Sequence, residues 1–237
     1  MKRQFFLSTL FALISVCVFG QEKPFAAGFM IQSGYSAVTP RLLNNNKYTG
    51  DFSLGIGLSF NYKISKRWVL QSGISYTTLR DRYHEDQLRW GSEHNGQGGH
   101  EPDPNMPHEA IFKYSHYFVD LMVGMRYYAN DGRFRAFVFP MVESNFYLSN
   151  RYETELLLED VPLQNDPLLE NNTTPFREVN FTAGLGIGLE AALSQQIKLI
   201  VMPSFEYMLL SMSKDAVVDN PPRFYNISAR LGLEYWF

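Results

Sequence analysis

Apolar and polar residues alternate along eight separate stretches of this 237-residue chain. Between residues 51 and 64, apolar side chains from Phe52 to Tyr62 occupy every second position, with Ser, Gly and Asn between them and Lys63 after them. Successive side chains of a strand point to opposite faces, so a period of two over this length predicts strands rather than helices. The expected strands are 25–39, 51–64, 68–82, 111–129, 133–149, 176–193, 197–213 and 223–237.

The connections between these stretches alternate between short and long. The short ones are 65–67, 130–132 and 194–196, and the second of these contains Gly132, which suits the positive φ of a tight turn. The long ones are 40–50, 83–110, 150–175 and 214–222. Short turns at one end and long loops at the other are typical of outer-membrane barrels. The pattern predicts an all-β fold, an eight-stranded antiparallel up-and-down transmembrane β-barrel with both termini in the periplasm.

The two faces of each expected strand differ in polarity. One face is continuously apolar, whereas the other carries Gly, Ser, Asn and charged residues. A soluble β-sandwich or barrel would bury the apolar face. Charges such as Glu190 and Arg230 can line an interior only if the apolar faces contact lipid, so we expect the strands to lie in outer-membrane lipid.

The interior enclosed by eight strands is just wide enough for side chains to fill it. An unpaired charge there is costly, so we expect inward acids and bases to pair and to plug the lumen. The predicted lumen charge network is Lys63, Asp120, Arg126, Arg135, Glu143, Glu190, Lys198, Glu206, Arg230 and Glu234. A narrow channel for small solutes is the alternative that this reasoning leaves open.

The N-terminus has the form of a secretory signal. Lys2 and Arg3 precede an apolar stretch from Phe5 to Phe19, which is too short to span a membrane as a helix. We expect cleavage after Gly20, which divides the chain into a signal peptide, 1–20, and a barrel domain, 21–237. Lipidation of Cys17 is the alternative, but this residue lies inside the apolar stretch.

Composition excludes several classes of protein. Cys17 is the only cysteine, so the mature chain has no disulfide, no thiol chemistry and no cysteine metal site. No stretch of 18 apolar residues follows the signal. The net charge of −3 argues against a nucleic-acid partner. We expect no cofactor.

The five histidines all fall between residues 84 and 116: His84, His94, His100, His108 and His116. Their spacings match no compact ligand motif, so a solvated loop is the favoured interpretation, and a divalent metal site stays open. An enzyme acting on lipid or peptide is a further alternative. Ser115 and His116 point to opposite faces of a strand, and His116 lies about 13 Å from Asp120 along it, so neither pair forms a nucleophile and base.

Two prolines interrupt the strand pattern. Pro140 and Pro203 lie inside the fifth and seventh expected strands and have no N–H to donate to a neighbour. We therefore expect a local bulge at each.

Aromatic residues make up 15% of the chain, which suits a barrel with two aromatic girdles at the membrane interfaces. Tyr128, Tyr235, Trp236 and Phe237 are among those expected in the girdle on the periplasmic side.

The last eight residues resemble the closing strand of bacterial outer-membrane β-barrels. Arg230, Gly232, Tyr235 and Phe237 fall at the polar, glycine and aromatic places of that motif. The resemblance implies that these residues form an assembly signal that the barrel-assembly machinery reads during insertion.

The signal peptide, the amphipathic strands, the glycine-rich inner faces and this ending together resemble the PorT-like outer-membrane β-barrel domain of Bacteroidetes. The resemblance implies a link to type IX secretion as one possible role. Our leading hypothesis is a non-enzymatic envelope barrel that presents its long loops to an envelope protein partner. A narrow channel and a lipid- or peptide-modifying enzyme are the rivals.

Overall fold

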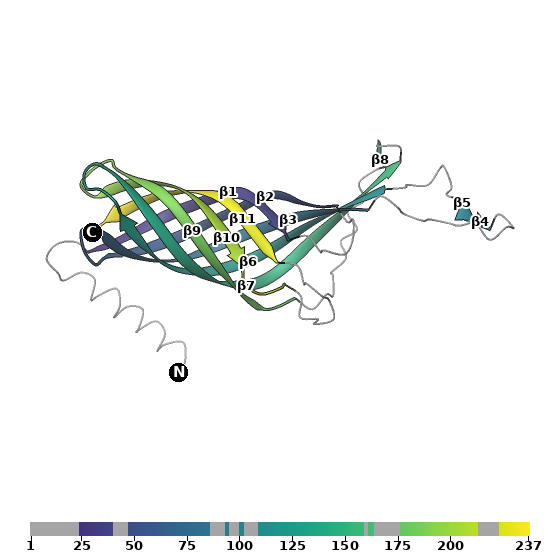
Figure 1. Ribbon diagram of the computed structural model, residues 1–237, viewed down its shortest axis with the longest axis horizontal. Helices are drawn as coiled ribbons and strands as arrows, with labels where there is room; N and C mark the ends of the chain where they lie inside the picture. The colour runs from purple at the N-terminus through teal and green to yellow at the C-terminus, as the bar shows by residue number, and fades with distance from the viewer. Residues whose placement is uncertain are drawn as a thin grey trace.

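Eight antiparallel strands form a closed ring (Figure 1). The computed structural model describes residues 24–39, 47–85, 93–94, 100–101, 109–158, 161–163, 176–212 and 223–237. The barrel strands are β1 (Phe25–Val38), β2 (Lys47–Lys63), β3 (Trp68–Glu85), β6 (Glu109–Tyr128), β7 (Phe134–Leu158), β9 (Val179–Ala192), β10 (Ile197–Met208) and β11 (Phe224–Trp236). Each pairs with the next in sequence, and β1 pairs with β11 to close the ring. The predicted fold is confirmed.

The three short connections lie at one end of the barrel, which we name the short-turn end, and the opposite end is the long-loop end (Figure 1). Gly132 has a φ of 123°, the left-handed conformation expected of it in the turn between β6 and β7. Pro24 and Phe237 also lie at the short-turn end, where the Phe237 amide donates a 3.0 Å hydrogen bond to the Phe25 carbonyl.

The outer surface of the ring is apolar. Ile56 and Ile187, which point outward, are 50% and 63% exposed, whereas the inward Arg126 and Glu234 are each 1% exposed. Such a band of exposed apolar side chains is costly in water and favourable against lipid. Among the described residues, no helix has the length and hydropathy to cross a bilayer.

The expected bulges at the prolines are wrong. Pro140 stays in register opposite Leu185, and Pro203 stays in register opposite Ala229. An antiparallel residue bonds with only one of its two neighbouring strands, so each proline leaves a gap in one ladder while the other ladder holds the register. The gaps fall between β6 and β7 and between β9 and β10.

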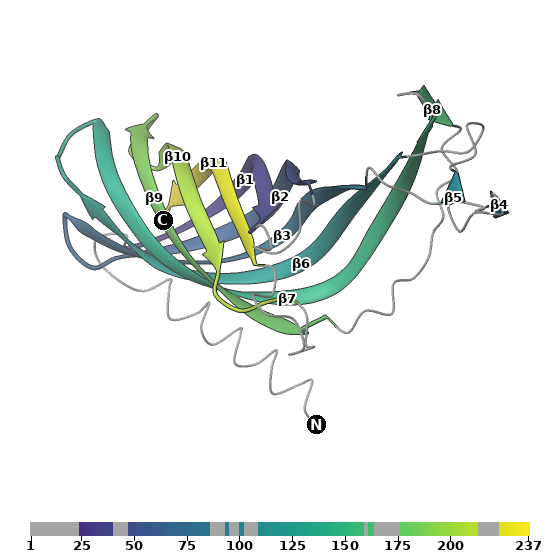
Figure 2. The same ribbon diagram turned by 45° about the vertical axis from the view of Figure 1, so that its right-hand side comes forward.

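Register shifts occur elsewhere, between Gly50 and Leu54 in the β2–β3 pair and at Tyr117–Phe118 in the β6–β7 pair. Both lie toward the long-loop end. Beyond them, β3, β6 and β7 continue as a curved sheet that projects past the rest of the barrel (Figure 2). Three short strands are outside the ring: β8 (Val161–Leu163) pairs with the tip of β7, and β4 (Glu93–His94) pairs with β5 (His100–Glu101).

The projecting sheet has ion pairs and aromatic rings. Arg82 pairs with Asp51 at 2.9 Å, and Lys113 pairs with Glu155. Rings follow one another across the strands, with centroids 4.9 Å apart for Tyr48–Tyr83, 5.9 Å for Tyr83–Phe112 and 6.1 Å for Tyr114–Tyr152. A hydrogen bond to Glu85 raises the pKa of Tyr83 to about 12, so this phenol stays protonated at neutral pH.

Candidate functional site: the lumen

Charged side chains gather in two clusters along the lumen. The first, the mouth cluster, lies toward the short-turn end and consists of Arg126, Arg135, Glu190, Lys198 and Glu234. Arg126 reaches Glu234 at 2.5 Å, and these residues come from β6 and β11 on opposite sides of the ring. Arg135 and Lys198 both contact one carboxylate oxygen of Glu190, at 2.5 and 3.0 Å. The Arg126–Glu234 pair thus crosses the lumen, whereas Arg135 and Lys198 reach Glu190 from the two strands beside β9.

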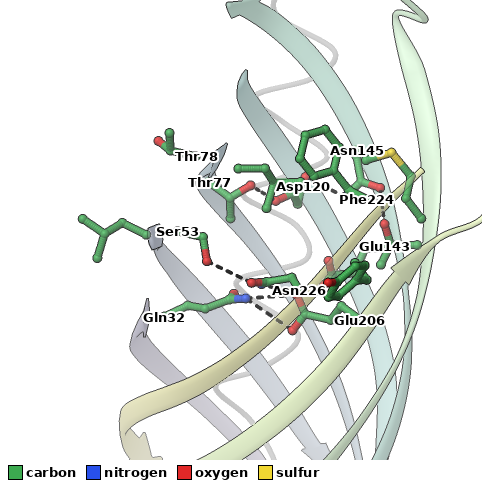
Figure 3. A pocket seen from close by; sticks show the side chains of 15 residues that line it. Gln32, Ser53, Thr77, Thr78, Asp120, Glu143, Asn145, Glu206, Phe224 and Asn226 are labelled. Atoms are coloured by element: carbon green, nitrogen blue, oxygen red, sulfur yellow. Dashed lines mark hydrogen bonds between the residues drawn. The ribbon is translucent and has the colours of Figure 1, made fainter. Parts of the chain in front are cut away.

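The second, the middle cluster, consists of Arg230, Glu143 and Glu206. The Arg230 guanidinium contacts Glu143 at 2.6 Å and Glu206 at 2.8 Å. Glu206 also accepts hydrogen bonds of 3.0 Å from Gln32 and from Asn226 (Figure 3). All three charged residues are buried. The cluster therefore combines a charge pairing with the additional hydrogen bonds that a buried ion pair requires.

Asp120 lies beside the middle cluster but is held by uncharged partners. It accepts hydrogen bonds from Thr77 at 2.5 Å and from Asn145 at 2.8 Å (Figure 3). The space among Asp120, Glu143 and Glu206 is a cavity of about 30 Å³. That volume is enough for an ordered water, for which about 10–15 Å³ suffices.

An apolar layer packs between the two clusters and around the mouth cluster, which the sequence reasoning did not anticipate. Its buried side chains are Ala26, Val69, Met122, Tyr128, Phe137, Phe139, Met141, Ile200, Met202 and Trp236. The methionines share the inward phase of the charged residues, which is a signal that could have placed them. Arg230 contacts the sulfur of Met122 at 2.9 Å, so the layer packs directly against the middle cluster.

Two aromatic residues expected in the membrane girdle lie inside instead. Tyr128 is fully buried and donates a hydrogen bond to Glu190, and Trp236 is 5% exposed beneath the Lys198 ammonium, 4.2 Å from its ring. The girdle expectation is wrong for these two because the strand phase turns them toward the lumen. Tyr235 and Phe237 point outward with their ring centroids 5.3 Å apart.

Lys63 stands apart from the other nine predicted lumen residues. It is exposed at the rim of the short-turn end, where it lines an open vestibule of about 260 Å³ together with Arg135, Glu190 and Lys198. Among the described residues, no carboxylate lies within ion-pair distance of its ammonium group. Lys63 is therefore a rim residue rather than part of a buried pair.

Two histidines at the long-loop end pair with acids. His116 lies 3.3 Å from Asp81, which the sequence reasoning did not single out, and His84 lies 2.8 Å from Glu109. His94 is opposite His100 in the β4–β5 pair, and His108 lies outside the described residues. Within the described ranges, no group of three or more histidine and acidic side chains is arranged to hold a metal ion.

The four residues of the expected assembly signal divide between the two faces of β11. Arg230 and Gly232 face the lumen, and Tyr235 and Phe237 face outward. The geometry leaves their role in assembly a prediction.

The lipid-facing ring and the charged lumen define a class of protein, the bacterial outer-membrane β-barrel. Within that class, a family model described as the type IX secretion system membrane protein PorP/SprF matches residues 29–235. The chain belongs to this family. Its members are components of a secretion system, and it is not a family of enzymes. The match does not show that the chain is a PorT-like protein in particular.

Solved barrels of the outer membrane resemble the chain only distantly. Neisserial surface protein A is 14% identical with a TM-score of 0.39, over 90% of this chain and 99% of that one. The outer membrane protein AlkL is 11% identical with a TM-score of 0.46, over 92% of each chain. The outer membrane protease OmpT from Escherichia coli is 10% identical with a TM-score of 0.41, over 93% and 100%. No curated protein sequence matches the chain.

Proposed function

We propose that this protein is a closed, non-enzymatic component of the type IX secretion apparatus, which occupies the outer membrane and presents its projecting strands and long loops to an envelope partner. The observation that carries the proposal is the middle cluster. Arg230 of β11 bridges Glu143 of β7 and Glu206 of β10, so the side chains meet across the lumen.

Two further observations support a closed lumen. The apolar layer beside the middle cluster is dry in character, because its methionine and aromatic side chains offer few polar groups to water. The cavity that Asp120, Glu143 and Glu206 line beside the cluster is small, at about 30 Å³. A continuous path for ions would have to pass both barriers.

The orientation is part of the proposal. We infer that the short-turn end and both termini face the periplasm, because barrels of this class have short periplasmic turns and longer outer loops. The projecting sheet then stands outside the cell. In the same way, residues 1–20 act as a signal peptide and 21–237 as the mature barrel, and Arg230, Gly232, Tyr235 and Phe237 act as the signal that the assembly machinery reads. The proposal includes the link to type IX secretion that the PorT-like resemblance implies.

Conductance measurements test the closed lumen against the channel alternative. Purified protein inserted into planar bilayers should give no discrete current steps. A double variant, Arg230→Ala with Glu206→Ala, removes the crossing contact and should give small steps, whereas Arg82→Gln, which changes a charge in the projecting sheet, should stay silent. Steady steps from the wild-type barrel would establish a channel.

A cellular assay tests the link to secretion and the enzyme alternative together. Deletion of the gene should retain type IX cargo inside the cell, and lipid A should have the same mass spectrum with and without the gene. An altered acyl pattern would favour the enzyme, and unchanged secretion would refute a necessary role in the apparatus.

A further inference from the structure

The lumen opens at the short-turn end into the vestibule of about 260 Å³. Its lining residues are Lys63, Lys66, Asp131, Gly132, Arg135, Glu190, Ala192 and Lys198. They come from β2, β7, β9 and β10 and from two of the short turns. Since β2 and β9 lie on opposite sides of the ring, the vestibule spans the mouth of the barrel and not one patch of its rim.

Positive charge exceeds negative charge already at the inner wall of this vestibule. Glu190 is shared by Arg135 at 2.5 Å, by Lys198 at 3.0 Å and, more weakly, by Arg126 at 4.0 Å. The main partner of Arg126 is Glu234. Three cations therefore share two carboxylates.

The outer wall increases the surplus. Lys63 and Lys66 add two cations, and Asp131 adds one carboxylate. In the described part of the chain, neither lysine has a carboxylate within 4.0 Å. The Arg135 guanidinium contacts the Lys66 carbonyl at 3.5 Å, which holds the β2–β3 turn against the vestibule wall. Along the lining of the vestibule itself, four cations face two carboxylates, a surplus of two charges.

We propose that the vestibule is a binding site for a doubly charged oxyanion group, either inorganic phosphate or two neighbouring carboxylates of an acidic protein segment. Lysine binds such groups as a point charge, and a concave site lined by one sign of charge concentrates the opposite ion. The open volume of about 260 Å³ admits the charged group of either ligand.

The proposal rests on the proposed function only for placing this mouth in the periplasm. The site itself follows from the charges and from the volume. A measurement of phosphate binding to the isolated barrel therefore tests the binding site separately from the proposed function, because phosphate affinity does not depend on conductance or on secretion.

Calorimetric titration of inorganic phosphate into the purified barrel in an uncharged detergent tests the site. The variant Lys63→Gln/Lys66→Gln should bind at least about tenfold more weakly, equivalent to about 1.4 kcal/mol. The matched control, Arg67→Gln/Arg133→Gln, removes the same charge from the same end but from residues that do not line the vestibule. Its affinity should change less than about twofold, because solvent screens exposed charges at a distance.

Two peptides identify the source of the anion. A short peptide with adjacent glutamates is compared with one that carries glutamines in their place. Tighter binding of the glutamate peptide than of phosphate, lost in the lysine variant, assigns the site to a protein segment. Binding of phosphate alone assigns it to a free anion. Equal weakening in both double variants, or no binding of either probe to the wild-type barrel, overturns the site. Heat-modifiable gel migration verifies that each variant is folded.

Discussion

The middle cluster and the mouth cluster hold similar residues in opposite settings. In the middle cluster, one guanidinium serves two carboxylates, and Gln32 and Asn226 complete the bonding of Glu206. In the mouth cluster, cations outnumber acids, and the wall opens into a vestibule. The middle cluster thus joins its charged groups to one another across the lumen, whereas the surplus cations of the mouth cluster border the open vestibule for which we propose a ligand.

The largest expected effect comes from breaking the middle cluster. Arg230→Ala leaves Glu143 and Glu206 buried without their cation, which should lower the free energy of unfolding by about 3–5 kcal/mol. Urea unfolding of the barrel in lipid vesicles, followed by tryptophan fluorescence, measures it.

A neutral cluster provides the control for this variant. Arg230→Met with Glu143→Gln and Glu206→Gln removes all three charges and should be less destabilised than Arg230→Ala alone, because no ion is left unpaired. If the triple variant is the less stable of the two, ion pairing is not what holds this level of the barrel together.

The apolar layer should be the next most sensitive. A Cβ at Gly188 would overlap the ring of Phe137, which is fixed between Tyr128 and the guanidinium of Arg126. We expect Gly188→Ala to cost about 1–3 kcal/mol by overpacking. At Gly232 the nearest heavy atom would be 3.5 Å away, an ordinary contact. Gly232→Ala, refolded in vitro, should therefore be the milder change, and equal losses would contradict the overlap.

The mouth cluster should tolerate loss of a cation. Lys198→Gln leaves Glu190 with Arg135 and Tyr128, so only one charged contact is lost and the unfolding free energy should fall by about 1.5 kcal/mol. The same vesicle unfolding assay applies. A loss comparable to that of Arg230→Ala would remove the distinction between the two clusters.

The smallest effect is expected in the projecting sheet. The Arg82 side chain is 43% exposed in its pair with Asp51, and solvent screens such a pair. Arg82→Gln should change the unfolding free energy by about 0.5 kcal/mol or less, and added salt should erase the difference. A larger, salt-independent loss would show that the sheet is coupled to the barrel.

The alternation of residues predicted the strands and the side chains that face inward, because strand phase depends only on neighbours in sequence. The same alternation predicted too short a strand for β7. The expected strand stops at residue 149, whereas β7 runs to Leu158. The reason is the register shift near Tyr117 and Phe118, past which the inward phase of β7 reverses. A period of two cannot be followed through such a reversal.

The pairing of charges could not be predicted in this way. Strand phase gives the face of a residue but not its height in the barrel, which depends on the stagger of all eight strands. Arg126 meets Glu234 and His116 meets Asp81 only because closure of the ring brings them to the same level. The strand phase alone would have placed Tyr128 and Trp236 in the lumen. The prediction was wrong because it followed the general preference of aromatic residues for membrane interfaces.

The two register shifts have a consequence for how this chain can vary. Each shift accommodates one extra residue at the base of the projecting sheet. A residue gained or lost in the projecting sheet therefore need not change which face of the barrel the side chains on the other side of the shift point to. The projecting sheet can therefore lengthen, shorten or change its surface while the membrane segment keeps its lipid-facing and lumen-facing residues. One polypeptide thus contains a part that is free to vary and a part that stays constant.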